Sequence, residues 1–586
     1  MSGRTHWGAL FGLILPHRAR VAAMSLVLAV AGGLPLLGPL LIAQFIDDAG
    51  GGAGRRRLLF LAVIYVAVGL ARQLMSVAVA WRAADLAWRV TNELRSRLTR
   101  HVLDLDLAFH RTTSPGELVS RVDGDVTAVS EFIAHFAVKA VAAVVTLSGL
   151  IAVLLLRDWR IGLGLALYLG TAVLTVFLLR NKAVDEAASE QAATGRMLGE
   201  VEERLTGADD LRANGGGSHA VATFQAASAA VLRSALQREK QGVTLWVISN
   251  MVFVLGGLII LAVDATLLRN GTITLGTAYL LFQYTQILRE PLDKLADETE
   301  RVQRAAGGMS RALQLLDEES ALVERSDGSL PPGALELELD QVAFSYPDED
   351  PPVPVLDGVS LTLGAGRSIG VLGRTGSGKT TLARLLLRLV DPTAGVVQFG
   401  GVDLCSVPRA QLRARTGVVS QEVHLFEASI RDNLTLFDDN VPDTEVRAAL
   451  EALDLQGWVE AMPDGLGTVL GPGGRGLSAG EGQLIALARL FLRSPDFVLL
   501  DEASSRIDPA TEERVTHAID RLLAGRTAVV IAHRLSTVER LDEMMFIEDG
   551  RVVERGSTAD LRDDPTSRYA GLIAAGSGAL VDEVTA

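Results

Sequence analysis

The stretch Gly373-Arg374-Thr375-Gly376-Ser377-Gly378-Lys379-Thr380 decides how the second half of this chain folds. It has the pattern G-x-x-x-x-G-K-T, with an apolar run over 368–372 before it and a helical pattern over 380–389 after it. A strand, a glycine-rich loop and a helix in this order predict a phosphate-binding loop, because glycine lets backbone N–H groups approach the phosphates. Lys379 is expected to reach the β- and γ-phosphates, and the Thr380 hydroxyl to hold Mg²⁺. A glycine-rich turn that matches by chance is the alternative, and the downstream residues disfavour it.

The composition predicts a membrane part followed by a soluble part. The chain has 586 residues, 49% of them hydrophobic, and its mean hydropathy is +0.29, with the apolar excess in the first half. A net charge of −15 argues against nucleic acid as a partner. The single cysteine, Cys405, excludes an internal disulfide and suits a reducing cytosol, where we expect it to pack rather than react. Residues 1–20 lack the features of a signal peptide.

The first half contains six apolar stretches, most of them close to the roughly 20 residues that span a bilayer. These are 21–46, 58–81, 136–156, 161–179, 242–263 and 273–288. Two long polar stretches with helical patterning, 82–131 and 181–240, separate the second span from the third and the fourth from the fifth. Turn-forming residues at 113–116 and 214–217 break each stretch once, which predicts two helical hairpins on one side of the membrane.

The arginine distribution gives the expected orientation. Seven arginines between Arg82 and Arg121 place that side in the cytosol, although Arg55, Arg56 and Arg57 lie on the predicted outside. The even number of spans agrees with the larger arginine group. We therefore expect a multi-pass protein of the cytoplasmic (inner) membrane, surrounded by membrane lipids, with its N-terminus and nucleotide-binding half in the cytosol.

Ionisable residues inside the spans are candidates for lining a water-filled cavity. The alternative is that Lys139 and Arg289 snorkel to the interface. The full set, with its uncharged polar companions, is Arg72, Lys139, Arg289-Glu290, Asn250, Gln283 and Gln286. The spans carry no other substrate signature.

Turn signals divide the chain into a transmembrane domain at 1–322, a linker at 323–334, a nucleotide-binding domain at 335–577 and a tail at 578–586. From residue 335 short strand patterns alternate with helical ones, which indicates a parallel sheet. The predicted fold is a six-helix all-α transmembrane domain with long cytosolic helical extensions, followed by an α/β P-loop ATPase domain.

Two more strands end in residues suited to nucleotide chemistry. The run 497–502 is apolar and ends in Asp501, expected to hold Mg²⁺, and Glu502, placed to activate the attacking water. Helix capping is the alternative role for Asp501. His533 follows the buried strand pattern 527–531, and strand ends in such sheets surround the ligand crevice.

The order and spacing of these pieces resemble an ATP-binding cassette (ABC) transporter of the exporter-fold type, over nearly the whole chain. The resemblance implies that Tyr346 stacks on adenine, that Gln421 senses Mg²⁺, that His533 contacts the γ-phosphate and that Asp508 lies in a loop crossing a dimer interface. It assigns Arg374, Thr375 and Thr381 to the phosphate site with the loop residues. It also implies that 114–118 and 207–214 are coupling helices and that Gly276, Pro291-Leu292 and Arg311 punctuate the sixth helix.

Three parts of the sequence depart from the family pattern. The usual signature Leu-Ser-Gly-Gly-Gln stands here as Leu477-Ser478-Ala479-Gly480-Glu481, which keeps Ser478 and Gly480 for a phosphate contact but brings a carboxylate close to it. Pro472 replaces a glutamate and Arg506 replaces a small residue. All three changes are expected on the face that meets a partner.

The resemblance implies ATP-driven export of a hydrophobic or amphipathic solute by a dimer, because ATP is sandwiched between the phosphate loop of one half and the signature of the other. A heterodimer with a second half-transporter is favoured over a homodimer, since the altered signature would complete the partner's site. Import of a siderophore or vitamin is one alternative. An ATP-gated channel or regulatory membrane subunit is another, disfavoured by the intact catalytic residues.

Overall fold

The computed structural model describes residues 12–157, 159–297, 299–322, 327–346, 353–421, 423–471, 476–501, 509–532 and 535–575, together with Gly8 and Gly474. The chain forms two compact units. Unit 1 comprises 1–105 and 113–319, and unit 2 comprises 106–112 and 320–586. The expected tail at 578–586 and the start of the expected linker, 323–326, lie outside the described residues.

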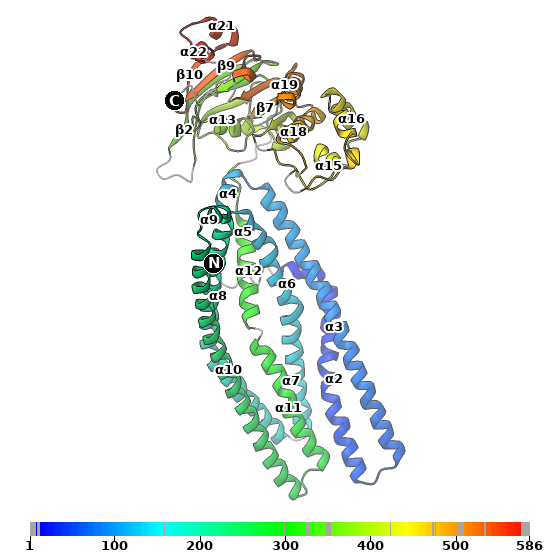
Figure 1. Cartoon of the computed structure of the whole chain (residues 1–586). Helices are drawn as coiled ribbons and strands as arrows, with labels where there is room; N and C mark the ends of the chain where they lie inside the picture. The colour runs from blue at the N-terminus through cyan, green and yellow to red at the C-terminus, as the bar shows by residue number, and fades with distance from the viewer. Residues whose placement is uncertain are drawn as a thin grey trace. The chain divides into compact units, whose positions relative to one another are not determined.

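Unit 1 is helical throughout (Figure 1). Its long helices are α2 (Arg18–Gly50), α3 (Arg55–Asp104), α7 (Ala137–Arg157), α8 (Trp159–Thr206), α10 (Gly217–Arg269), α11 (Leu275–Asp297) and α12 (Thr299–Asp317). Short elements join them: η1 (Leu15–His17), α5 (Pro115–Val119), η2 (Ser120–Asp125), α6 (Val126–Glu131), η3 (Phe132–Phe136) and α9 (Ala208–Ala213). The predicted helix breaks at 113–116 and 214–217 fall where α5 and α10 begin.

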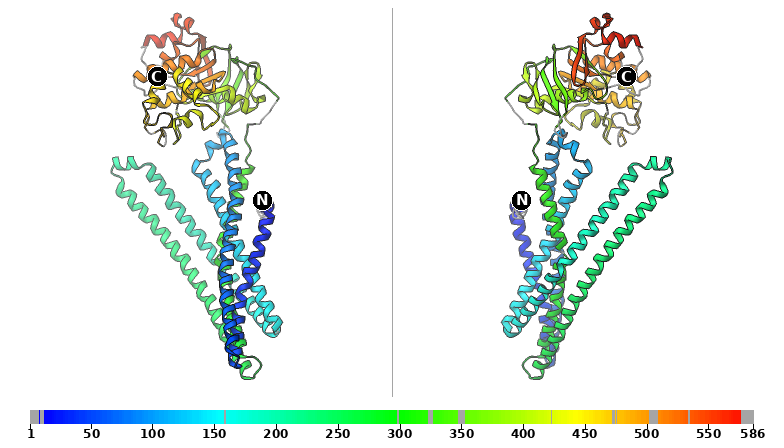
Figure 2. Two further views of the ribbon diagram at one scale, coloured as in Figure 1. Left: turned by 90° about the vertical axis from the view of Figure 1, so that its right-hand side faces the viewer. Right: turned by 90° about the vertical axis from the view of Figure 1, so that its left-hand side faces the viewer.

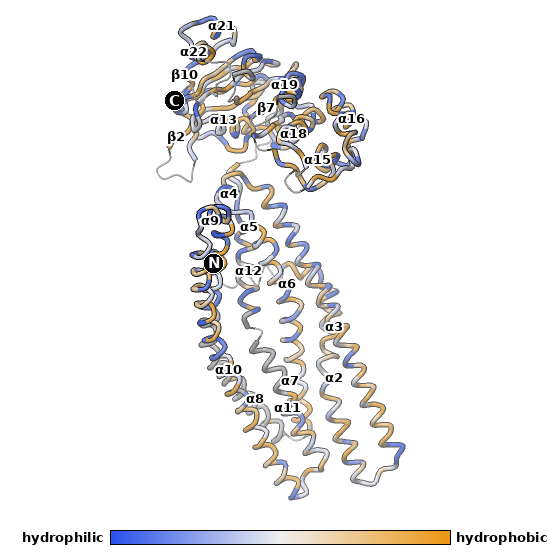
Figure 3. The backbone as a smooth tube through the Cα atoms, in the orientation of Figure 1, coloured by the Kyte–Doolittle hydropathy of each residue, from blue (hydrophilic) through white to orange (hydrophobic). Residues whose placement is uncertain are grey.

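Four helical stretches of the described residues are long and apolar enough to cross a membrane: Gly12–Gly50, Arg55–Asp104, Pro115–Leu156 and Gly217–Arg269. The other two expected spans lie in α8 and α11, parts of which have side chains outside the described set. Figure 3 shows that apolar residues dominate the half of α3 nearest α2's loop, while its other half is mixed with polar ones. This division matches helices that leave the membrane and continue in water.

Helices α2, α7 and α11 pack into one apolar core. Tyr284 is fully buried and its hydroxyl donates to the Leu36 carbonyl oxygen at 3.0 Å. At the end of α2, Asp47 accepts from the Gly276 N–H at 2.8 Å, and a Cβ at Gly276 would lie 2.1 Å from the Ala43 carbonyl oxygen. Glycine at 276 therefore permits the close approach of α11 to α2.

The extension of the sixth helix, α12, packs against the first hairpin through a charged pair and a glycine. Arg311 on α12 donates its Nε to Asp125 at 2.9 Å, and the Asp125 side chain is largely buried. The hydrogen bond to Asp125 raises the pKa of Arg311 and burial lowers it. The hydrogen bond has the larger effect, so the pKa is raised. A Cβ at Gly308 would lie 2.7 Å from the Asp125 carbonyl oxygen. The expected punctuation at Arg311 thus fixes α12 against η2.

Helices α8 and α10 form the second hairpin, closed by α9. In Figure 2 this hairpin separates from the other helices of unit 1 as it approaches α9. Several apolar side chains along its free part are exposed: Leu198, Leu205, Val221, Phe224, Leu232 and Leu236. Exposed apolar side chains on a part of the hairpin that leaves the other helices indicate a contact with another protein segment.

Unit 2 is an α/β domain with two sheets. A four-stranded antiparallel sheet has the order β2-β1-β4-β5, with bounds β1 (Leu337–Ser345), β2 (Pro354–Leu363), β4 (Ala394–Phe399) and β5 (Val402–Asp403). A six-stranded sheet has the order β10-β9-β3-β8-β7-β6, with bounds β3 (Ser368–Leu372), β6 (Thr416–Val419), β7 (Phe497–Asp501), β8 (Thr527–Ile531), β9 (Glu543–Glu548) and β10 (Arg551–Ser557). All but β10 run parallel.

The helices of unit 2 are α4 (Leu107–Thr112), α13 (Lys379–Leu386), α14 (Arg409–Arg415), α15 (Ile430–Thr435), α16 (Asp443–Ala452), α17 (Gln456–Glu460), α18 (Ala479–Arg493), α19 (Pro509–Leu523), α20 (Leu535–Val538), α21 (Thr558–Asp563) and α22 (Arg568–Ala575). Two short helical turns are η4 (Leu404–Ser406) and η5 (Gly465–Gly467).

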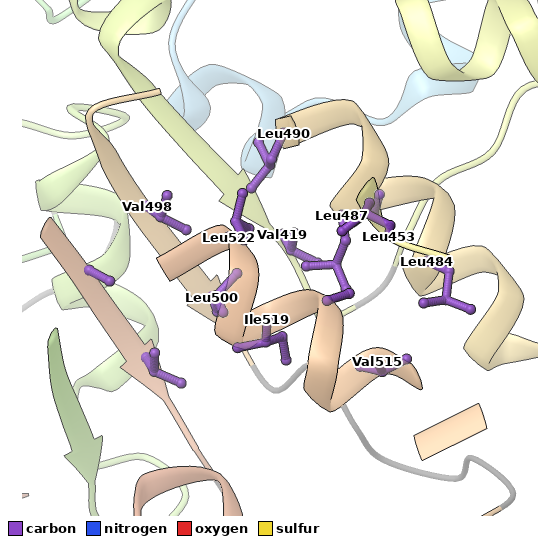
Figure 4. Close-up of a cluster of buried hydrophobic side chains, with 14 of the residues drawn as sticks. Val419, Leu453, Leu484, Leu487, Leu490, Val498, Leu500, Val515, Ile519 and Leu522 are labelled. Atoms are coloured by element: carbon purple, nitrogen blue, oxygen red, sulfur yellow. The ribbon is translucent and has the colours of Figure 1, made fainter. Parts of the chain in front are cut away.

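Alternate residues of the six-stranded sheet enter two cores. Phe497 and Leu499 of β7 face a core shared with α13 and the antiparallel sheet, whereas Val498 and Leu500 face α18 and α19 (Figure 4). Because both faces are covered, these strands are continuously apolar. The two layers hold the carboxyl ends of the parallel strands rigidly, which is where the candidate site lies.

Candidate nucleotide site

The site is built at the edge where four parallel strands end. Strands β3, β8, β7 and β6 are neighbours, with Val371 opposite Ile531, Ile531 opposite Asp501, and Leu500 opposite Val419. The phosphate loop follows β3, Asp501 ends β7, and Gln421 comes two residues after β6. The structure therefore brings these three predicted elements to one edge. Glu502, Asp508 and His533 lie outside the described residues. In the sequence Glu502 comes directly after β7, and His533 comes two residues after the end of β8.

The loop has the backbone that its glycines predict. Gly376 and Gly378 have φ of 86° and 106°, in the left-handed region that favours glycine. A Cβ at Gly378 would lie 2.6 Å from the Leu356 Cδ2 atom, while at Gly376 it would meet nothing within 4 Å. The loop is thus closely packed against the protein at one glycine and open at the other.

Two polar side chains are buried within the loop. Lys379, 6% exposed, donates to the carbonyl oxygens of Gly373 and Arg374, the latter at 2.9 Å. Ser377 is equally buried, and its hydroxyl has no hydrogen-bond partner among the described residues. A buried hydroxyl without a partner is costly unless a ligand satisfies it, so the loop fits an anionic group or the metal that accompanies it. Thr380, the expected Mg²⁺ residue, is exposed at the start of α13.

Tyr346, the expected adenine-stacking residue, is held by several neighbours. Its hydroxyl lies 3.0 Å from the Thr381 hydroxyl and accepts from Arg384 at 2.7 Å. The guanidinium of Arg111 lies 4.1 Å from its ring centroid. Arg111 thus makes a cation–π contact on a face that the resemblance assigns to adenine.

Arg111 comes from a segment far away in the sequence. It lies on α4, whose first turn is capped by Asp106, which accepts from the Phe109 N–H at 3.0 Å. The other Asp106 carboxylate oxygen accepts from the Ala321 N–H and the Ser320 hydroxyl. These bonds attach 106–112 to the start of the main part of unit 2. The expected first coupling helix, 114–118, is helical as α5 with Ser114 as its N-cap.

The altered signature begins α18. Ser478 is the N-cap, and its hydroxyl accepts from the Glu481 N–H at 3.3 Å while the Glu481 carboxylate accepts from the Ser478 N–H at 2.7 Å. The second carboxylate oxygen accepts from the Trp458 indole N–H at 2.8 Å. This is a capping box extended by a third residue. Both oxygens of Glu481 are engaged within the unit, and Gly480 is buried beside it.

A buried polar cluster joins α18 to the segment after Gln421. Arg489 on α18 donates to the carbonyl oxygens of Asn433 at 2.6 Å and His424 at 3.1 Å. Asn433 is fully buried and accepts from the Phe426 N–H at 2.9 Å. Burial lowers the pKa of Arg489. These hydrogen bonds therefore join the signature helix to the chain that follows Gln421.

Sequence reasoning did not find Arg111, Arg384, Trp458, Asn433 or Arg489. None belongs to a local motif, and each acts on a residue distant in sequence. The Ser-x-x-Glu spacing of a capping box at 478–481 was the one visible signal.

Within unit 1, Arg72 and Lys139 line one cavity of about 730 Å³ with Arg95, His135 and Glu131. This arrangement agrees with the cavity hypothesis for these two residues. Arg95 also forms an ion pair with Asp123 at 3.0 Å. The side chains of Arg289 and Glu290 lie outside the described residues.

Comparison with known proteins decides the family. Residues 21–292 match the family model described as ABC transporter transmembrane region, and residues 356–505 match the one described as ABC transporter. The ATP-dependent lipid A-core flippase of Thiobacillus denitrificans is 30% identical over 570 residues, covering 96% of each chain. This chain belongs to the ABC transporter family.

Other similarities extend over the same length. An ABC transporter ATP-binding protein of Bacillus subtilis, itself uncharacterised, is 29% identical, covering 94% of this chain and 91% of that protein. The structure of a bacterial Atm1-family ABC exporter with ATP bound superposes with a TM-score of 0.81 at 24% identity, covering 95% of this chain and 98% of that one. The predicted fold class is confirmed. This ABC transporter is a membrane protein that uses ATP, and it couples the hydrolysis of ATP to transport.

Proposed function

We propose that this ABC transporter exports a hydrophobic or amphipathic solute across the cytoplasmic membrane as one half of a dimer, with its N-terminus and ATPase unit in the cytosol. The observation that carries the ATP-dependent part is the convergence of the phosphate loop, Asp501 and the start of the Gln421 segment at one strand edge. The apolar spans and the arginine-rich hairpin support the membrane orientation.

The site residues take the roles that their positions suggest. The loop N–H groups and Lys379 hold the β- and γ-phosphates, and Tyr346 contacts adenine once Arg111 has moved. Glu502 orients and deprotonates the attacking water, and His533 contacts the γ-phosphate. The buried, unpartnered Ser377 hydroxyl supports a close ligand at this point.

A divalent metal fits the same edge. Thr380, Asp501 and Gln421 have the oxygen donors that Mg²⁺ prefers: Asp501 ends β7, Gln421 comes two residues after β6, and Thr380 is in the first turn of α13, after the phosphate loop. When bound, Mg²⁺ would neutralise negative charge on the phosphates.

A dimer follows from the single signature in each chain, since Ser478 and Gly480 serve the partner's nucleotide and Asp508 lies at the interface. The exposed apolar side chains on the α8–α10 hairpin support a protein partner. We propose a heterodimer because Pro472 and Arg506 depart from the family pattern on the face expected to meet the partner. The capping box explains why a glutamate stands at position 481, so Glu481 is no evidence for a weakened nucleotide site.

The variant Glu502→Gln tests the catalytic assignment. It should bind ATP with unchanged affinity and lose turnover, whereas Lys379→Ala should lose binding. Both are measured by fluorescent-nucleotide titration and phosphate release on the purified full-length assembly. Unchanged phosphate release by Glu502→Gln would remove Glu502 from its role.

Transport direction is tested in inside-out vesicles with candidate solutes. ATP-dependent uptake into the lumen supports export, ATP-dependent depletion supports import, and ATP-gated flux down a gradient supports a channel. Purification of an active assembly that contains this chain alone would overturn the heterodimer.

A further inference from the structure

A carboxylate in the membrane unit is buried. Asp264 lies on α10, five residues before the end of that helix, and is 4% exposed. Neither of its carboxylate oxygens has a hydrogen-bond partner among the described residues. A buried charge at membrane depth is costly unless it is paired, so such a residue indicates a ligand or a functional site.

Asp264 faces a cavity of about 840 Å³ between four helices. Most of the lining is apolar, from Leu154 on α7, Leu167 on α8, Ile260 on α10 and Leu281 on α11. Among the described residues that line it, Asp264 is the only charged side chain. A volume between about 300 and 1,000 Å³ with apolar walls and few polar groups is typical of small-molecule sites.

Tyr168 on α8 supplies an aromatic surface to the same cavity. Its ring lies close to α10 because residue 256 is glycine, where a Cβ would be 2.2 Å from the Tyr168 Cε2 atom. Phe253 packs against it edge-on, with ring centroids 6.3 Å apart. The Tyr168 hydroxyl is buried without a hydrogen-bond partner among the described residues.

We propose that this cavity binds an amphipathic organic cation, with Asp264 as its counter-ion and the Tyr168 ring against its charged or aromatic part. A single positive charge neutralises the carboxylate, and the apolar body fills the walls. The cavity lined by Arg72, Arg95 and Lys139 holds these three basic residues against one carboxylate, Glu131, and so offers the opposite net charge. The proposal names the substrate class and rests on the proposed transport function, with which it shares the membrane unit.

The test is equilibrium binding to the full-length assembly in nanodiscs without nucleotide. Rhodamine 123, a monocation, is compared by fluorescence anisotropy with rhodamine 110, which has the same ring system but a free carboxylate. The cation should bind at least about tenfold more tightly than the zwitterion, because removing or opposing one buried charge of a pair is expensive.

Variants locate the effect. Asp264→Asn should weaken rhodamine 123 binding at least about tenfold, and Asp264→Glu should retain it within about threefold. Asp48→Asn is the matched control, because Asp48 pairs with Arg57 at 2.6 Å and does not line the cavity. This variant should bind rhodamine 123 as tightly as the unaltered protein does.

Equal binding of the two dyes, or undiminished binding to Asp264→Asn, overturns the proposal. If Asp264→Asn fails to fold, the dye pair and Asp264→Glu still decide it. Because no nucleotide is present, a failed ATPase assignment at Glu502 leaves this result unaffected, and a negative binding result leaves the ATPase assignment standing.

Discussion

Replacing Glu481 by alanine should destabilise the ATPase unit. Glu481 accepts from the Ser478 N–H at 2.7 Å and from the Trp458 indole N–H at 2.8 Å. Alanine removes both acceptors, so the Ser478 N–H at the start of α18 and the Trp458 indole N–H on α17 lose their partner. It also breaks the reciprocal capping box, although the Ser478 hydroxyl still accepts from the backbone of residue 481.

The magnitude follows from these contacts. Loss of a helix cap costs about 1 kcal/mol, and a hydrogen bond to a charged acceptor contributes about 1.5 kcal/mol or more. The sum is about 2–3 kcal/mol. For a unit of this size 1 kcal/mol moves the melting temperature by about 2–4 °C, so the fall should be about 4–12 °C.

The assay is thermal unfolding of the full-length protein measured by differential scanning calorimetry, because Trp458 is the one tryptophan in unit 2 and its fluorescence is lost in a Trp458 variant. Trp458→Phe keeps an aromatic ring at this position but removes the N–H donor. It should therefore lower the free energy of unfolding by about half as much as Glu481→Ala does, and the double variant should lower it by less than the sum of the two. Additive effects of the two substitutions would refute the bond between them.

The variant Glu481→Gln separates a structural role from a repulsive one. Glutamine retains one carbonyl oxygen for the cap but lacks the second acceptor, so stability should fall by about 1 kcal/mol. Because both carboxylate oxygens are engaged, ATPase turnover should change less than about twofold. An increase of tenfold or more would refute the reasoning, since it would mean that the carboxylate repels the nucleotide.

Three further results are expected. Arg111→Ala frees the Tyr346 ring and should tighten binding of a fluorescent ATP analogue about two- to fivefold, and unchanged affinity would contradict a competing contact. Burial raises the pKa of Cys405 to about 12, so its thiol stays protonated at pH 8 and should react with a maleimide far more slowly in folded than in denatured protein. Gly276→Val should lower the melting temperature of the membrane unit by displacing α11 from α2, at a cost of about 1–3 kcal/mol, while Gly69→Val, whose Cβ meets nothing within 4 Å, should not.

Elements whose signals are local were predictable from the sequence. The strand patterns at 368–372 and 527–531 coincide with β3 and β8, and the phosphate loop lies between β3 and α13 as expected. Parallel strands place their carboxyl ends together, so the shared edge followed from the expectation of a parallel sheet. The long hairpins followed from helical periodicity and turn residues.

Contacts between distant segments were not predictable. Arg111 and Tyr346 are 235 positions apart and meet only because 106–112 folds with unit 2. Asp264 ends a strongly apolar span, and its position gave no sign that four helices would enclose a cavity beside it. Such placements depend on tertiary packing, which no periodicity encodes.

The capping box changes what the altered signature says about the partner. The sequence showed a carboxylate near a phosphate contact, which suggested a weakened site in an asymmetric pair. The structure gives that carboxylate two donors, Ser478 and Trp458, so its presence is accounted for by helix stability. The Ser478 and Gly480 positions are kept, so Glu481 gives no ground against the proposal that this signature completes the nucleotide site of a second copy. A heterodimer then depends on Pro472 and Arg506 alone. Substituting these two towards the family pattern, and not Glu481, is therefore the change that should alter turnover if the partner's site is weakened.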